Sequence, residues 1–521
     1  MPGKEPVDKK ESHEKIAPYQ IPKRNPSATY SHNYTFSRTD SDRLYFIPNN
    51  NYDENEEPIL EDLDCVMPGE FNLKQGQTTL VIDATQILHR IFYFPQIQTW
   101  KNLSNVYNET IEKYIQNGSS IRKLILCIDN PTTIPSCKSI IQRERNSKTV
   151  ILNENQVQQI TIGEGMIVPK QEKMPLDQYK NSLLANRLVK NDIQGWLTTQ
   201  LIFSKFSRKI KLIVDEIKFK WIKELGCEGL ENTKKKDDDF IIFEVNVDKV
   251  LDQMSIKAGG SIGEGELKCF KYVIRETRLL IGDKKQKEEN YETPKESITM
   301  VSNDTDLLMI SLLNFYDLID PETGYLRQTV YIYDFDKVLN LNILWRWIFD
   351  HYQCYSGKYQ TETPIENLAF MFILNGSDYT EGITRVALLT ILKKFRQDQA
   401  FFSRFKINSR KSVSLFKTKF GLGQQDMERR IDICCEQPFI EIIQHFALMS
   451  NSTEKNHTNI LQYRAYLFRI LWVMRMWSNA CKLRKYTIED PIESKGWCID
   501  ENGLVVRTYG IDSSHNVIKG N

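Results

Sequence analysis

The sequence predicts an α/β protein whose core is a parallel sheet flanked by helices. Four short apolar runs predict strands: TTLVID (78–83), KLILCID (123–129), ITMVSND (298–304) and TVYIYDF (329–335). Helical patterns separate these runs, and strands that alternate with helices are typical of βα units. Three of the four runs end in an aspartate. Ligands of such sheets bind beyond the carboxyl ends of the strands, so these aspartates are expected at one edge.

The remaining segments predict the domain organisation. The first 75 residues are polar and rich in Asn, Asp, Ser, Pro and Tyr, which is typical of a disordered or extended segment. After it, the predicted organisation is an α/β core at 76–400 that contains a helical insertion at 146–257, with a long helical tract at 183–225, and a divergent helix-turn-helix at 378–400. A helical region at 401–486 and an irregular tail at 487–521 follow.

Length and composition limit the class of protein but do not identify its function. The 521 residues suffice for two to four domains, and 69 basic against 68 acidic residues give a net charge of +1, so any basic surface has to be local. The ten cysteines lack zinc-ligand spacing and are expected to be reduced, buried thiols. The N-terminus has no apolar leader, and no run of about 18 apolar residues occurs. We therefore expect an intracellular protein of the nucleus or cytoplasm, without a membrane partner.

Seven acidic residues carry the chemistry that the sequence suggests. Two pairs, Glu264 with Glu266 and Asp304 with Asp306, have i, i+2 spacing, which places both carboxylates of a pair on one face of an extended segment. Such crowding raises the pKa of each carboxylate unless cations compensate, and Mg²⁺ is the usual hard cation for oxygen ligands. The candidate metal ligands are Asp83, Asp129, Glu264, Glu266, Asp304, Asp306 and Asp378.

Each acidic motif also has a purely structural interpretation. The aspartates in VIDATQIL (81–88) and LCIDNP (126–131) could cap helices. The glutamates in GGSIGEGELKCF (259–270) could stabilise the first turn of a helix. The acids in VSNDTDLL (301–308) and NGSDYTEG (375–382) could belong to solvated turns.

Taken together and in order, these motifs resemble the flap endonuclease/XPG superfamily of 5′-nucleases, which has a PIN-like catalytic domain. The resemblance covers about 77–146 and 258–400. It implies that the seven acids bind two Mg²⁺ ions, for which Mn²⁺ can substitute. It also implies that Lys138 and Arg143, or Arg145 in place of Arg143, act as basic residues on the scissile phosphate, and that the His89 ring stacks on a nucleobase.

Basic residues of the insertion predict a path for a single strand. Lys205, Arg208 and Lys209 lie in the predicted helical tract, where they could guide nucleic acid. The alternative is a solvated basic stripe on a core helix.

The chain also departs from the family pattern. The segment TEGITRVALLTILKKF (380–395) holds a single glycine, Gly382, where the family has a G-x-G turn that binds a duplex phosphate through K⁺. No sliding-clamp motif of the form QxxLxxFF occurs. The motif IGEGE (262–266) is also similar to that of Xrn-type 5′→3′ exonucleases.

The sequence therefore predicts a monomeric, Mg²⁺-dependent, structure-selective 5′-nuclease. Its expected partners are branched or single-stranded DNA, cleaved at 5′ flaps or single-stranded 5′ ends by two-metal catalysis. Two alternatives stay open: an Xrn-like exonuclease that degrades RNA, and a catalytically inactive nucleic-acid-binding scaffold.

Overall fold

The fold of the chain is that of a computed structural model. It describes residues 34–38, 44–47, 66–68, 77–117, 121–133, 138, 149–150, 152–167, 174–204, 210–226, 240–247, 254–258, 263–284, 297–318, 329–334, 337–341, 344–345, 364–380, 382, 407–415, 425–433, 435–450, 460–480, 497–499 and 505–507. No helix among these residues combines the length and the apolar character that crossing a membrane requires.

Among the residues that the structure describes, a mixed sheet of nine strands forms the centre, in the order β3-β11-β10-β9-β4-β5-β6-β7-β8. The five strands from β10 to β6 are parallel to one another, and antiparallel strands extend the sheet at both edges. The strands are β3 (Val66–Pro68), β4 (Gln77–Asp83), β5 (Lys123–Cys127), β6 (Lys211–Lys218), β7 (Phe240–Asn246), β8 (Met254–Ala258), β9 (Ser297–Val301), β10 (Thr329–Asp334) and β11 (Lys337–Asn340). The four strands predicted from the sequence, now β4, β5, β9 and β10, are confirmed.

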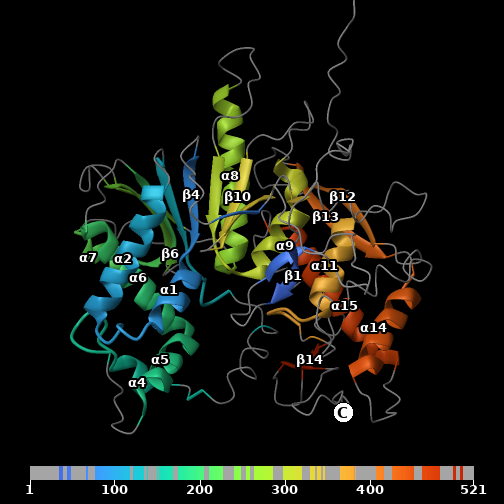
Figure 1. The fold of residues 1–521 in the computed structure, drawn as a ribbon, viewed down its shortest axis with the longest axis horizontal. Coiled ribbons are helices and arrows are strands. Elements are labelled where there is room, and N and C mark those ends of the chain that lie inside the picture. The colour runs from blue at the N-terminus through green and yellow to red at the C-terminus, as the bar shows by residue number, and fades with distance from the viewer. Residues whose placement is uncertain are drawn as a thin grey trace, which may run out of the picture.

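Helices cover both faces of this sheet, so the architecture is a three-layer α/β sandwich (Figure 1). One layer contains α1 (Ala84–Phe92), α2 (Trp100–Asn117), α4 (Glu154–Gln158), α5 (Leu176–Ala185), α6 (Arg187–Phe203) and α7 (Phe219–Glu224). The other contains α8 (Gly265–Lys284), α9 (Thr305–Leu313), the 3₁₀ turn η3 (Phe315–Leu318), α11 (Pro364–Leu374), α14 (Gln437–Ser450) and α15 (Ile460–Ser478).

Alternating side chains of the central strands separate two hydrophobic cores. In β4, Leu80 and Ile82 point into the core under α1, α2 and α6, whereas Val81 points into the core under α8, α9 and α15. We call these the N-terminal core and the C-terminal core. A strand buried on both faces reads as a continuous apolar run, which is why β4 and β5 are recognisable in the sequence.

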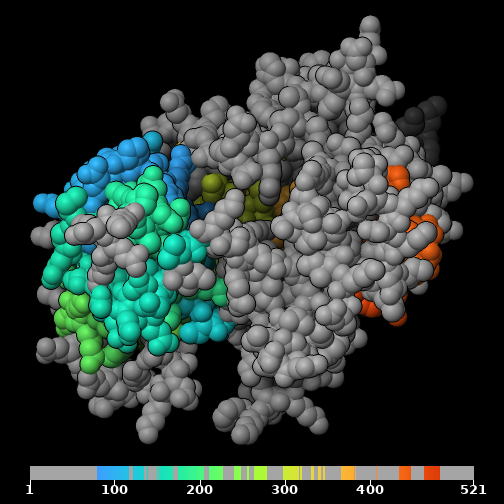
Figure 2. Space-filling view, turned by 90° about the horizontal axis from the view of Figure 1, so that it is seen from below, coloured from blue at the N-terminus to red at the C-terminus, as the bar shows by residue number. Residues whose placement is uncertain are grey.

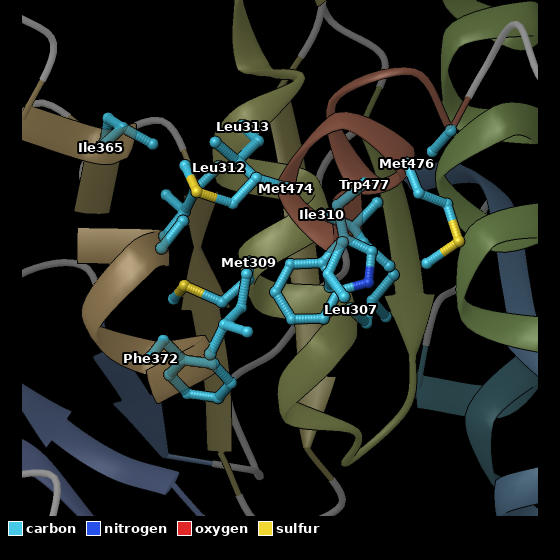
Figure 3. Packing of buried hydrophobic residues seen from close by; sticks show 14 of the residues in the cluster. Leu307, Met309, Ile310, Leu312, Leu313, Ile365, Phe372, Met474, Met476 and Trp477 are labelled. Carbon is cyan, nitrogen blue, oxygen red and sulfur yellow. The ribbon is translucent and has the colours of Figure 1, made fainter. Parts of the chain in front are cut away.

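The C-terminal helices are integral to the second layer. Side chains of α9, α11 and α15 interdigitate, among them Met309, Phe372 and Trp477 (Figure 3). The Asn314 side chain at the end of α9 donates a 2.6 Å hydrogen bond to the carbonyl oxygen of Trp477. The region after residue 436 therefore completes the same core as the sheet.

Several predicted helical segments are strands instead. The helical tract predicted at 183–225 is interrupted by β6, and β7 and β8 extend the sheet from the same insertion, so the insertion 146–257 is only partly helical. The region predicted as helical at 401–486 contains the hairpin β12 (Ile407–Leu415) and β13 (Gln425–Ile433).

The two termini also contain strands. The tail predicted as irregular contains paired strands β14 (Trp497–Ile499) and β15 (Val505–Arg507). In the first 75 residues, β1 (Tyr34–Arg38) pairs with β2 (Leu44–Ile47), and β3 joins the main sheet. Of the segment predicted as a helix-turn-helix at 378–400, residues 383–400 lie outside the described part of the chain.

Candidate functional site

Three of the predicted aspartates follow three adjacent parallel strands. Asp83 is the last residue of β4, Asp129 lies two residues after β5, and Asp304 lies three residues after β9. β4 lies between β5 and β9 in the sheet, so all three carboxyl ends meet at one edge. This placement confirms the topological argument made from the sequence.

Two of these aspartates also cap helices. Asp83 Oδ1 accepts hydrogen bonds from the backbone N–H groups of Thr85 (3.0 Å) and Gln86 (3.2 Å), at the start of α1. Asp304 Oδ1 accepts one from Asp306 N at 2.8 Å, at the start of α9. The Gln86 side chain donates to Asp304 Oδ2 at 2.9 Å and so joins the two caps. Capping and membership of an acidic cluster are therefore compatible here.

Gly265 allows the start of α8 to approach the strand ends closely. Its backbone N–H donates to Asp129 Oδ1 at 2.9 Å. A Cβ atom at this position would lie only 2.5 Å from Asp83 Oδ1, so a larger residue does not fit without movement. The glycine between the two glutamates thus brings Glu264 and Glu266 to the aspartates.

A buried lysine connects the remaining acids. Lys138 Nζ lies 2.5 Å from Glu264 Oε1, 2.7 Å from Asp378 Oδ2 and 4.0 Å from Glu266 Oε1. The Tyr379 hydroxyl donates to the other oxygen of Glu264. Five separate chain segments and a lysine therefore form one cluster, which we call the acidic centre: Asp83, Asp129, Lys138, Glu264, Glu266, Asp304, Asp306 and Asp378.

Burial and mutual repulsion raise the pKa values of several of these carboxylates. Burial raises the pKa of Asp83 well above its usual range, and the charges of Asp129 and Asp304 add to the effect. The pKa values of Glu266 and Asp306 are raised well above their usual range by burial, with further contributions from neighbouring carboxylates. Burial, followed by the charge of Asp378, raises the pKa of Asp304 to about 6.

Two ammonium groups offset part of this negative charge. Burial alone would raise the pKa of Asp129, but Lys190 Nζ, 2.9 Å from its Oδ2, lowers that pKa below its usual range. Burial would lower the pKa of Lys138, yet the charges of Asp378, Glu264 and Glu266 raise it well above its usual range. Lys138 is therefore a permanent cation inside the acidic centre.

The donor set of the acidic centre fits a hard divalent cation. All seven acids offer carboxylate oxygens, which Mg²⁺ and Mn²⁺ prefer. As the described side chains stand, no three acidic, histidine or cysteine residues are arranged around a single metal position. A cation bound here would compete with the Lys138 and Lys190 ammonium groups for these carboxylates.

The other predicted nucleic-acid contacts divide into one that can be placed and several that cannot. His89 lies in α1 and is half-buried, and desolvation lowers its pKa to about 4, so its ring is neutral at physiological pH. Its electrostatic interactions with Lys190, Asp129 and Asp378 place it beside the acidic centre. The other predicted contacts, Arg143, Arg145, Lys205, Arg208 and Lys209, lie outside the described residues.

A second buried charge cluster contacts the backbone next to Asp129. Lys268 of α8 donates to the carbonyl oxygen of Ile128 at 2.6 Å and lies 3.4 Å from both Asp215 and Glu216 of β6. The Tyr272 hydroxyl donates to Asp215 at 2.8 Å. Glu216 sits at a bulge of β6 with a φ of 75°, a conformation that costs a non-glycine residue energy.

Three residues of the site were not anticipated as functional. Lys190 lies 61 positions after its partner Asp129, and no spacing rule connects them. Gln86 follows a predicted aspartate but carries no signal of its own. Tyr379 belongs to the GSDY motif, where only the aspartate had been assigned a role.

The space-filling view shows part of the surface around these elements. In Figure 2, the blue to green segments, which include α1, α2 and α6, form one block, and olive residues near position 300 are visible beside it.

No protein-family model matches this chain, and no curated protein sequence is significantly similar to it. Any functional assignment consequently depends on the acidic centre itself.

Proposed function

We propose that this protein is a divalent-metal-dependent 5′-nuclease that hydrolyses phosphodiester bonds in DNA, at 5′ flaps or single-stranded 5′ ends. One observation carries the proposal. Seven carboxylates from five separate segments gather at the carboxyl edge of three adjacent parallel strands, with a buried lysine among them. Such a concentration of buried acids is costly for stability unless cations bind there.

The residues that would hold two Mg²⁺ or Mn²⁺ ions are Asp83, Asp129, Glu264, Glu266, Asp304, Asp306 and Asp378. Two divalent ions held there would activate a water molecule and stabilise the departing 3′-oxygen, and the product would carry a 5′-phosphate. The protein's own contribution is orientation. The caps at Asp83 and Asp304 fix their carboxylates on the ends of α1 and α9, and Gly265 N–H fixes that of Asp129.

Lys138 would bind the scissile phosphate of the substrate. Its charge lies between Glu264 and Asp378, and the charges of these acids keep it protonated. When cations neutralise the acids, this ammonium group becomes available to the scissile phosphate, as the resemblance to flap endonucleases implies. Arg143 or Arg145 would assist from the same segment, and His89 would stack on a base.

The finer architecture belongs to the same proposal. The central sheet would be a PIN-like nuclease domain, and the insertion at 146–257 would cover the acidic centre as an arch or cap. β6 fixes the insertion to the sheet next to β5, so only its parts outside the sheet can serve as a cover. Lys205, Arg208 and Lys209 would then guide a single strand.

A nuclease assay on labelled substrates tests the proposal. We expect the full chain with Mg²⁺ to cleave 5′-flap or single-stranded 5′-end DNA, and chelation to abolish cleavage. Asp304→Ala should abolish cleavage while DNA binding persists, because phosphate contacts come from basic residues. Glu436→Gln is the matched control, since Glu436 pairs with exposed Arg464 far along the chain.

The same assay separates the alternatives. Cleavage of 5′-phosphorylated RNA with no cleavage of DNA would identify an RNA exonuclease. Binding of nucleic acid without cleavage in Mg²⁺ or Mn²⁺ would identify a scaffold and refute the enzyme. Undiminished cleavage by Asp304→Ala would place catalysis elsewhere in the protein.

A further inference from the structure

The GSDY loop and the start of α8 are joined by a closed set of contacts. Lys138 contacts Glu264 and Asp378, and the Tyr379 hydroxyl donates to Glu264. Because Tyr379 follows Asp378 directly, the four residues form a ring. Both oxygens of Glu264 are therefore held, one by an ammonium group and one by a phenol hydroxyl.

Tyr379 is itself fixed by the C-terminal helix α15. The tyrosine is fully buried. Arg469 Nη1 donates to its carbonyl oxygen at 3.3 Å, and Trp472 packs on its ring edge-to-face with a centroid distance of 6.3 Å. Arg469 and Trp472 lie three residues apart, so both come from one face of α15. Lys138 Nζ approaches the same ring, 5.1 Å from its centroid.

The burial of Arg469 is unusual for an arginine. Its side chain is completely inaccessible within the C-terminal core, which a charged group occupies only at a substantial desolvation cost. Hydrophobic packing alone does not require a guanidinium group at this position. Its hydrogen bond to Tyr379 connects a helix 90 positions away to the acidic centre.

We propose that Arg469 and Tyr379 are positioning residues through which α15 orients Glu264 for metal binding. The proposal rests on the nuclease function proposed above and adds a residue set to it. Arg469 and Trp472 fix the tyrosine ring, and the hydroxyl fixes one oxygen of Glu264. The other oxygen, which Lys138 contacts in this structure, is the one left for a cation. Without the hydroxyl, the Glu264 carboxylate can rotate away from the position that a cation needs.

Tyr379→Phe tests this directly, because it removes the hydroxyl and keeps the ring that Trp472 and Lys138 contact. Partners of metal ligands typically change metal affinity or activity by about 10- to 100-fold. We expect a weakening of Mn²⁺ binding in this range, measured by electron paramagnetic resonance of the full chain without DNA. We also expect kcat for flap cleavage to fall, with KM for DNA unchanged.

Variants of α15 extend the test. Arg469→Met should weaken Mn²⁺ binding in the same direction, and Arg469→Lys should recover part of it. Arg464→Met is the matched control, because Arg464 lies on the same helix and pairs with Glu436 at the surface. Circular dichroism melting shows whether each variant folds. If Arg469→Met does not fold, Tyr379→Phe still decides the question.

The outcomes distinguish this proposal from the proposed function. Wild-type Mn²⁺ affinity and wild-type kcat in Tyr379→Phe would overturn the positioning role even if the protein is a nuclease. Weakened Mn²⁺ binding in Tyr379→Phe would support the role even if the wild-type protein cleaves no DNA. A wild-type protein that binds no Mn²⁺ would overturn both.

Discussion

Replacing Gly265 by alanine tests whether the acidic centre needs the close approach of α8. The added Cβ atom would lie 2.5 Å from Asp83 Oδ1 and 2.9 Å from its Cγ, whereas ordinary van der Waals contact begins at 3.4 Å. The helix or the carboxylate must therefore move by about 0.9 Å, since packed atoms do not overlap. The same movement strains the hydrogen bond from Gly265 N–H to Asp129.

A misplacement of about 1 Å in a catalytic arrangement costs on the order of 100-fold in rate. We therefore expect Gly265→Ala to lower kcat for 5′-flap cleavage about 100-fold, with little change in KM for DNA. The free energy of unfolding should fall by about 1–3 kcal/mol, the cost that is typical of overpacking.

The measurement is steady-state cleavage of a labelled flap together with thermal unfolding. Gly226→Ala serves as the control, because no atom lies within 4 Å of its Cβ position and its φ of +79° strains only the local turn. The control should lose stability and keep kcat. A Gly265→Ala enzyme with wild-type kcat would refute the packing argument.

Three further predictions concern stability. The pKa of Asp304 is about 6 in the folded chain against about 3.9 when unfolded, so the folded state holds the extra proton and stability falls as pH rises from about 4 to 6. With chelator present, the free energy of unfolding in urea should therefore be higher for Asp304→Asn than for wild type, by up to about 3 kcal/mol at pH 7 and by little at pH 4. Equal differences at the two pH values would contradict this. Lys268→Met should lower the free energy of unfolding by about 3–5 kcal/mol, because it removes the ammonium group that compensates the buried charges of Asp215 and Glu216. The control Lys220→Met changes an exposed lysine and should lower the free energy of unfolding by at most about 1 kcal/mol. Similar urea midpoints for Lys268→Met and Lys220→Met would contradict this prediction. Deleting residues 1–70 should leave a core that still unfolds cooperatively. Because the deletion removes β3 and exposes the edge of β11, this core should self-associate in size-exclusion chromatography. Deleting residues 1–60 keeps β3 and should not cause self-association.

The sequence predicted the parts of the fold that local chemistry controls. β4, β5, β9 and β10 are apolar runs buried on both faces, and their aspartates lie where parallel topology requires. β6 was read as helix because KLIVDEIK is short and flanked by helical patterns, and periodicity alone does not separate a buried strand from a buried helix.

Long-range partners of the site could not be predicted in the same way. The contact of Lys190 with Asp129 depends on how α6 packs over the sheet, and the contact of Arg469 with Tyr379 depends on how α15 enters the C-terminal core. These placements follow from tertiary packing of many apolar side chains, and a single sequence carries little information about it.

The separation of the two cores has a consequence for synthesis on the ribosome. Apart from a few side chains such as Val301 and Tyr333, the N-terminal core comes from residues 80–256, so that layer can collapse while the chain is still growing. The C-terminal core needs helices up to α15, and until they emerge the apolar face with Val81 and Ile125 is exposed, as is the edge of β4. A nascent chain of this protein therefore passes through a long aggregation-prone interval. Tyr379, which contacts the acidic centre, gains its hydrogen bond from Arg469 only after residue 469 has left the exit tunnel.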